Sequence, residues 1–205
     1  MSNRRLIIGD SVVDMTCLKI RRLASADAPA YREIRLAGLR DNSEAFGSTF
    51  ARESTQPLTW FGDRLSNSAV FGAFDRAVLL GVAGLRICEG EKERHKGLLW
   101  GMYVRPDSRQ AGVGRRLVKA VIDYARDHVE VVQLSVVSSN ERARRLYAGL
   151  GFVEYGLERK SLKQNGCYYD EFLMALDLRL DLDQYSLPAA RAGAALEELT
   201  RSSSE

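Results

Sequence analysis

The strongest constraint on the fold is one continuous stretch that predicts a strand, a glycine-containing loop and a helix in succession. Residues 98–104 are apolar and aromatic, as in a buried strand. Pro106 then ends the strand, because proline has no backbone N–H for the sheet ladder. The loop that follows carries Gly112 and Gly114. Side chains that recur every three or four residues next define one face of a helix: Val113, Leu117, Val121, Tyr124 and His128.

A loop of this kind favours an anionic ligand. The start of the helix offers unpaired backbone N–H groups and the positive end of the helix dipole, and glycine lets a phosphate approach without meeting a β-carbon. A nucleotide P-loop would need Lys and then Ser or Thr after Gly114, where Arg115 and Arg116 stand. A dinucleotide-binding fingerprint would need a third glycine at Leu117 and its first glycine directly after the strand. Neither of these phosphate-binding motifs fits the sequence.

Two motifs in the chain carry a family resemblance. Residues 109–114, Arg-Gln-Ala-Gly-Val-Gly, match the pattern Arg/Gln-x-x-Gly-x-Gly/Ala. Residues 140–152 match a second pattern, Asn-x-x-Ala-x-x-x-Tyr-x-x-x-Gly-Phe. With both motifs in this order, the chain resembles the GNAT superfamily of acetyl-CoA-dependent N-acetyltransferases over about residues 18–178.

The order of predicted elements is typical of an α/β protein. Strands are expected at residues 15–23, 69–74, 77–88, 98–104, 131–137, 152–162 and 168–178. The last two are joined by Lys163-Gln164-Asn165-Gly166, which is a hairpin signal. Helices are expected at residues 25–39, in short pieces within 41–67, and at 113–128 and 140–150. Such an order predicts a sheet with helices on both faces. The resemblance implies a GNAT-like fold, with a mixed, mostly antiparallel twisted sheet of about six to seven strands and a splay between two central parallel strands.

Length and composition predict one globular domain with tails. The chain has 205 residues, of which 45% are hydrophobic and 28% are charged. We expect an irregular N-terminal leader at residues 1–14, an N-acetyltransferase domain at 15–178 and a C-terminal extension at 179–205. The extension is rich in Ala, Glu and Ser without a matching apolar face, so we expect it to be partly helical or disordered.

Several classes of function are disfavoured by the same sequence. A net charge of +3 is too small to indicate nucleic-acid binding. The longest wholly apolar run, residues 77–85, is too short to cross a bilayer, and the apolar run after Arg5 is too short for a signal peptide, so we expect a cytoplasmic protein and no membrane partner. With two histidines, and three scattered cysteines that fit reduced thiols, we expect no metal site.

The resemblance implies a site for acetyl-CoA as the acyl-donating cosubstrate. By family analogy, the backbone of Met102, Tyr103 and Val104 pairs with the pantetheine arm. The diphosphate is held by the loop and helix start, which comprise Arg109, Gln110, Ala111, Gly112, Val113, Gly114 and Arg115.

The second motif supplies two further candidates. Asn140 is expected to hydrogen-bond the pantetheine arm, to cap the helix, or to do both. Tyr147 lies two helical turns further along the same face. It is the expected catalytic acid that protonates the leaving thiolate; the alternative is a half-buried packing aromatic.

The general base is the point at which the chain departs from part of the family. Some members carry a glutamate where this chain has Leu98. We therefore expect no single dedicated base, and that the amine loses its proton to water or to a relay. The carboxylates that could act through water are Glu33, Asp41, Glu44, Glu53, Asp170 and Glu171.

The resemblance predicts direct transfer of an acetyl group to a primary amine of a small molecule or peptide. By family analogy the acceptor binds between residues 41–67 and 164–169. An alternative from another class is a non-catalytic acyl-CoA-binding regulatory module, and a homodimer is possible in either case.

Overall fold

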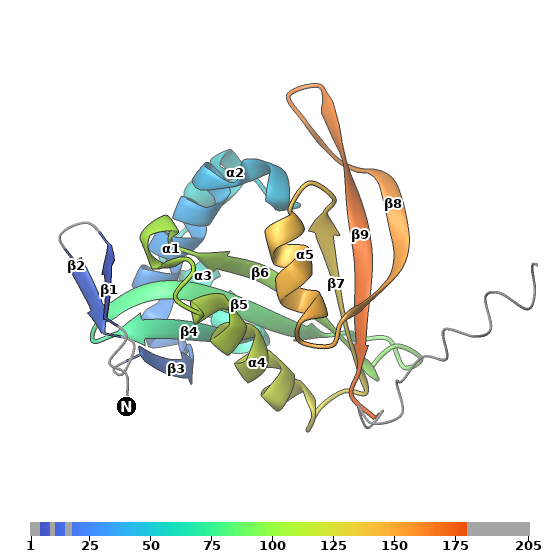
Figure 1. Ribbon diagram of the computed structural model, residues 1–205, viewed down its shortest axis with the longest axis horizontal. Helices are drawn as coiled ribbons and strands as arrows, with labels where there is room; N and C mark the ends of the chain where they lie inside the picture. The colour runs from blue at the N-terminus through green and yellow to red at the C-terminus, as the bar shows by residue number, and fades with distance from the viewer. Residues whose placement is uncertain (1–4, 9–10, 15–17, 180–205) are drawn as a thin grey trace, which may run out of the picture.

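A single seven-stranded sheet organises the chain (Figure 1). The computed structural model describes residues 5–8, 11–14 and 18–179. The spatial order of the strands is β3-β4-β5-β6-β7-β9-β8. Their bounds are β3 Leu18–Arg22, β4 Ala69–Asp75, β5 Val78–Ile87, β6 Lys96–Val104, β7 Val131–Val137, β8 Val153–Gln164 and β9 Cys167–Asp177.

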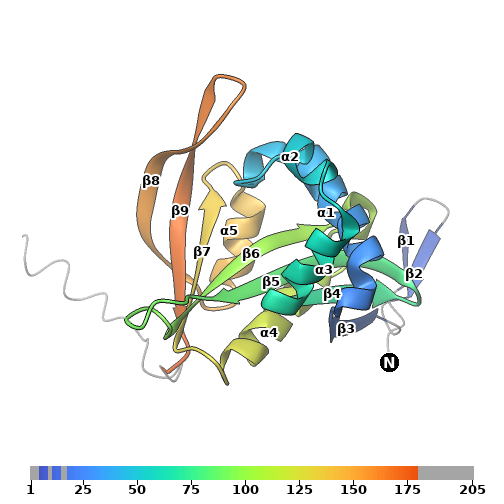
Figure 2. The same ribbon diagram turned by 180° about the vertical axis from the view of Figure 1, so that it is seen from behind.

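Helices cover both faces of this sheet. On one side lie α1 (Ala28–Asp41), α2 (Phe50–Ser54) and α3 (Leu58–Asn67), and on the other lie α4 (Val113–Ala125) and α5 (Glu141–Ala148) (Figures 1 and 2). Three short 3-10 turns complete the set: η1 (Ser25–Asp27), η2 (Ser43–Ala45) and η3 (Pro106–Ser108). The predicted α/β architecture, including the strand count and the mixed sheet, is confirmed.

The sheet divides in its middle, between β6 and β7. These two strands run parallel and pair only through Lys96, Gly97 and Leu98. Further along, β6 contains a bulge at Gly101. Its register with β5 shifts there, between the β5 residues Val82 and Gly84. Gly101 has φ of +65°, which glycine adopts readily, and a bulge of this kind bends the strand. Beyond Leu98 the two strands diverge, which is the predicted splay.

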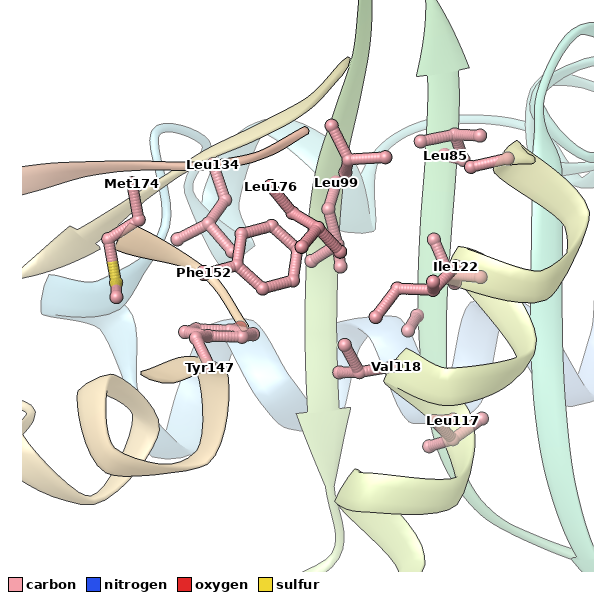
Figure 3. Packing of buried hydrophobic residues seen from close by; sticks show 14 of the residues in the cluster. Leu85, Leu99, Leu117, Val118, Ile122, Leu134, Tyr147, Phe152, Met174 and Leu176 are labelled. Carbon is pink, nitrogen blue, oxygen red and sulfur yellow. The ribbon is translucent and has the colours of Figure 1, made fainter. Parts of the chain in front are cut away.

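A hydrophobic core on the α4–α5 side holds the two halves of the sheet together (Figure 3). Leu117 and Val118 on α4 are completely buried, and Leu85 and Leu99 belong to the same core on the sheet. Burial of one such leucine stabilises the fold by about 1.5–3 kcal/mol. A second core on the opposite face is built around α1 and α3, where Tyr31 is among the buried residues. The glycine loop therefore projects from a rigid strand and a rigid helix.

Residues 5–14 differ from the expected irregular leader. They include two short antiparallel strands, β1 (Arg5–Ile8) and β2 (Ser11–Asp14), which pair along their full lengths. The predicted C-terminal extension lies outside the described residues except for residue 179. The hairpin between β8 and β9 has the predicted turn, with positive φ angles at Asn165 and Gly166.

Candidate functional site

A cavity of about 490 Å³ lies at the splay. Its walls come from the end of β6, the glycine loop, the start of α4, the end of β7, the start of α5 and η2. Ten of the twelve predicted site residues line it, namely Met102, Tyr103, Val104, Arg109, Gln110, Gly112, Val113, Gly114, Arg115 and Asn140. Ala111 and Tyr147 are buried in the adjoining core instead.

The start of α4 is built to receive an anion. Gly112 is its N-cap, with φ of +76°, and no side chain accepts a hydrogen bond there. The first amides of the helix therefore keep their N–H donors free for a ligand. A β-carbon at Gly112 would meet nothing within 4 Å, whereas one at Gly114 would lie 2.9 Å from Cε of Met102. Gly112 thus leaves the cavity open, and Gly114 allows α4 to pack closely against β6.

Arg109 ties the glycine loop to the rest of the site. Its Nε donates to the backbone oxygen of Val104 at 3.0 Å, and its Nη2 donates to Oδ1 of Asn42 at 2.9 Å. The guanidinium also lies 5.7 Å from the ring centroid of Tyr103. Two of its donor atoms are thus engaged within the protein, so Arg109 joins the cofactor side of the cavity to the segment that follows α1.

Tyr103 forms a second connection to α1. Its hydroxyl donates to Oδ2 of Asp41 at 2.5 Å. Burial, together with this hydrogen bond and the negative charge of Asp41, raises the pKa of Tyr103 to about 12. The phenol therefore stays protonated at neutral pH and holds the end of α1 against β6.

Asn140 is the N-cap of α5. Its Oδ1 accepts a hydrogen bond from the backbone N–H of Ala143 at 3.1 Å, which confirms the predicted cap. The cap uses only the oxygen, so the side-chain amide NH₂ remains available on the cavity wall. Its hydrogen bond to a pantetheine arm stays a prediction.

Tyr147 is buried behind the cavity wall, with 5% of its surface exposed. Its ring packs edge-to-face on Phe152, with 5.8 Å between centroids (Figure 3). Burial raises the pKa of the phenol above its ordinary value, so the proton is retained. No hydrogen-bond partner of the hydroxyl lies in the described part of the chain, and the neighbouring Leu146 lines the cavity.

The carboxylates proposed to act through water are mostly engaged elsewhere. Glu53, which is 1% exposed, accepts two hydrogen bonds from Arg35 at 2.9 and 2.8 Å. Desolvation pushes the pKa of Glu53 upward, but the hydrogen bonds and charge of Arg35 outweigh it and the pKa is lowered. Asp170 accepts from the backbone N–H of Lys160.

The other carboxylates differ in their surroundings. Glu33 pairs with Arg105 at the surface, and Asp41 is bound to Tyr103 as described above. Glu44 lines the cavity. Glu171 is buried on β9, where serine hydroxyls donate to it.

The geometry can be compared with known proteins. The sequence model described as the acetyltransferase (GNAT) family matches residues 35–152, which is more than half of the chain. The chain belongs to the GNAT acetyltransferase family. The family assignment made from the two motifs is thereby confirmed.

Two proteins of assigned function are similar in sequence to this GNAT chain. N-alpha-acetyltransferase RimI of Mycobacterium tuberculosis is 34% identical over 110 residues, which cover 52% of this chain and 64% of that protein. L-amino acid N-acyltransferase MnaT of Escherichia coli is 34% identical over 92 residues, which cover 43% of this chain and 50% of that protein. The similarity thus spans between half and two thirds of each relative.

Solved structures share the GNAT fold over most of their length. YncA of Salmonella typhimurium, which was solved with its cofactor acetyl-CoA, aligns with a TM-score of 0.69 and 24% identity over 80% of this chain and 95% of that one. Ribosomal-protein-alanine N-acetyltransferase from Brucella melitensis aligns with a TM-score of 0.67 and 25% identity over 78% and 99%.

One wall of the GNAT cavity comes from residues 41–67, the segment that family analogy had assigned to the acceptor. Asn42, Glu44 and Phe46 line it from η2 and its flanks, between α1 and α2. The sequence analysis named this segment and Glu44 within it, but it gave no role to Asn42 or Phe46.

The described residues contain neither a metal-binding cluster nor a membrane-spanning helix. Among residues 5–8, 11–14 and 18–179, no cluster of three or more His, Cys, Asp or Glu side chains could hold a metal ion. None of the helices in these ranges is long and apolar enough to cross a membrane. Cys88 and Cys167 are free thiols, and Cys17 lies outside the described residues.

Proposed function

We propose that this GNAT-family protein transfers the acetyl group of acetyl-CoA directly to a primary amine. The observation that carries the proposal is the cavity between the diverging strands β6 and β7, which continues to the uncapped start of α4. One end of such a cavity suits a diphosphate, and the other exposes strand backbone to a thioester. A GNAT structure of the same fold, YncA, was solved with acetyl-CoA.

Each part of the site would then have a distinct task. The amides at Gly112 to Arg115 would hold the diphosphate, and a backbone N–H of the bulged part of β6 would donate to the thioester oxygen. As the amine nitrogen bonds to the carbonyl carbon, the C–S bond breaks and the sulfur takes a proton. Tyr147, which burial keeps protonated, would be the donor.

The names of the relatives favour an amino-acid or peptide amine as the acceptor. RimI is named as an N-alpha-acetyltransferase and MnaT as an L-amino acid N-acyltransferase. Both names refer to α-amino groups or amino acids, so free amino acids and peptide N-termini are the first acceptors to try. A cytoplasmic location and a homodimer stay predictions.

The test is release of free thiol from acetyl-CoA in the presence of a panel of amines. The panel should contain amino acids, short peptides and polyamines, with product acetylation confirmed by mass spectrometry. We expect thiol release that depends on at least one amine. Tight binding of acetyl-CoA without amine-dependent release from any acceptor would contradict the proposal and favour the regulatory acyl-CoA-binding module.

A further inference from the structure

Ser135 on β7 and Glu171 on β9 form a linked pair beside the splay. Oγ of Ser135 donates to Oε1 of Glu171 at 2.9 Å, and Oγ of Ser161 donates to Oε2 of the same carboxylate at 2.6 Å. Glu171 is only 8% exposed, whereas Ser135 is exposed. The exposed hydroxyl of Ser135 thus connects the buried carboxylate of Glu171 to the protein surface by a hydrogen bond.

The pair lies on the face of the sheet that is opposite α4 and α5. Val132, Leu134 and Val136 on β7 are buried in the core on the α4–α5 side, so the alternate residue Ser135 points the other way. Figure 2 views this second face, on which α1 and α3 lie over β4, β5 and β6 rather than over β8 and β9. Ser135 is therefore accessible from the side of the early helices, whereas Glu171 is buried behind it.

The pair also lies next to the cavity. Val137 lines the cavity. It lies on the same face of β7 as Ser135, two residues further along, and it pairs directly with Glu171 on β9. The turn η2, which forms another cavity wall, packs against β7. Ser135 and Glu171 do not line the cavity themselves; they continue the same face of the sheet beyond Val137, which does.

The direction of the hydrogen bonds determines what this pair can bind. A serine hydroxyl has one proton, and that of Ser135 is directed to Glu171. Its oxygen lone pairs are consequently free to accept from an N–H donor. Ser161 reaches the other oxygen of Glu171 because β8 is irregular between Glu158 and Leu162. The carboxylate is thus fixed from both sides, with one route to solvent through Ser135.

We infer that Ser135 and Glu171 bind the ammonium group of the acceptor and remove its proton, an inference that rests on the proposed acetyl transfer. One N–H proton passes to Oγ of Ser135 as the hydroxyl proton of Ser135 passes to Oε1 of Glu171. The amine lone pair thus freed attacks the thioester carbonyl. Ser135 is the catalytic residue that touches the acceptor, and Glu171 acts through it. The relay supplies a base that Leu98 cannot provide.

Charged groups of both signs lie near the relay. Glu158 is opposite Glu171 on β8, and Glu44 lies on η2, which packs against β7. Tyr169 is on the same face of β9, two residues before Glu171, and β7 itself carries no charged side chain. On β8, the amino groups of Lys160 and Lys163 lie over the ring of Tyr168, and the guanidinium of Arg144 lies over the ring of Phe172. Within this set, Glu171 is the carboxylate that an acceptor at Ser135 would reach.

The experiment measures kcat/KM for the acceptor from pH 6 to pH 10, with an amine of pKa about 10. The variants are Glu171→Gln, Ser135→Ala and Ser135→Thr, and Ser161→Ala is the matched control because it removes only the hydrogen bond to the other carboxylate oxygen. Affinity for acetyl-CoA is measured for each by calorimetry. Glu171→Gln keeps the shape of the side chain, and Ser135→Thr keeps the hydroxyl on a strand.

We expect Glu171→Gln and Ser135→Ala to lower kcat/KM at pH 7 by about 100-fold, the usual effect of removing a general base. The loss should shrink as the pH approaches the amine pKa, because free amine needs no base. Ser135→Thr should remain within about threefold of wild type, since the relay from the acceptor is intact. Ser161→Ala should lose less than Ser135→Ala, because it removes only a hydrogen bond that holds the carboxylate. Affinity for acetyl-CoA should be unchanged in all four.

Two results would overturn the relay. One is a Glu171→Gln enzyme with the wild-type rate and pH profile. The other is a loss at Ser161→Ala equal to that at Ser135→Ala, which would mean that the hydroxyls only support the hairpin. In either case the wild-type enzyme would still acetylate amines. A wild-type protein that acetylates none would instead contradict the proposed function itself.

Discussion

Replacement of Gly112 by alanine separates ligand binding from folding. Gly112 has φ of +76°, and a β-carbon built there meets no atom within 4 Å. Alanine therefore fits without a clash and causes two effects only. It strains the backbone by about 1–2 kcal/mol, and it places a methyl group in the cavity beside the first amides of α4.

Gly166 provides a matched control. It has φ of +81°, also with nothing within 4 Å of a built β-carbon, but it lies in the turn between β8 and β9. Gly166→Ala should carry the same strain and lower the melting temperature by about 2–4 °C per kcal/mol, as for Gly112→Ala. Only Gly112→Ala should disturb a bound diphosphate. Loss of one hydrogen bond to a charged oxygen, about 1.5–3 kcal/mol, raises Kd about 10- to 150-fold.

The assay is calorimetric titration of each variant with acetyl-CoA, with thermal unfolding of the same samples. We expect equal losses of stability and a weaker affinity in Gly112→Ala alone. If Gly112→Ala binds acetyl-CoA as tightly as Gly166→Ala does, the diphosphate does not rest on this loop. The assignment of the first motif would then be refuted.

Three further changes test other parts of the site. Tyr147→Phe should lower the transfer rate constant at pH 7 by about 100-fold with little change in Kd for acetyl-CoA, measured by single-turnover kinetics; near-normal turnover would remove the phenol from the acid's role. Glu53→Ala should destabilise the fold by about 3–5 kcal/mol in urea, because Arg35 would be left buried without its partner. In the folded state the pKa of Glu53 is lowered from 4.5. The stabilisation by ionised Glu53 is therefore complete above pH 4.5 and is lost as the pH falls through the lowered pKa. Acid unfolding of the wild type and of Glu53→Gln would measure this loss. Arg109→Lys should weaken the connection to Asn42 and raise KM for the acceptor severalfold, and an unchanged KM would argue against coupling of the two walls.

Local patterns in the sequence were sufficient for most elements of the fold. The apolar repeat that begins at Val113 predicted α4, although the helix ends at Ala125 rather than at 128. The Asn165-Gly166 pair predicted the turn between β8 and β9, because both residues tolerate positive φ. The strands β1 and β2 were missed, although Gly9-Asp10 between two apolar runs is a hairpin signal of the same kind.

Features that depend on strand register could not be read from the sequence. The family resemblance implied a splay, but its cause is the bulge at Gly101, which appears only once β5 and β6 are paired. Likewise, Ser135 and Glu171 are 36 residues apart, and they meet because β7 and β9 pair in one particular register. The motif also suggested that Arg109 faces a phosphate, whereas two of its donors bind Val104 and Asn42 within the protein.

The most direct test of the account is a crystal structure of this protein with acetyl-CoA. The account predicts that the diphosphate contacts the backbone amides from Gly112 to Arg115, and that the pantetheine arm lies between β6 and β7 with its thioester near Met102. Coenzyme bound elsewhere, with the glycine loop closed by its own side chains, would contradict it.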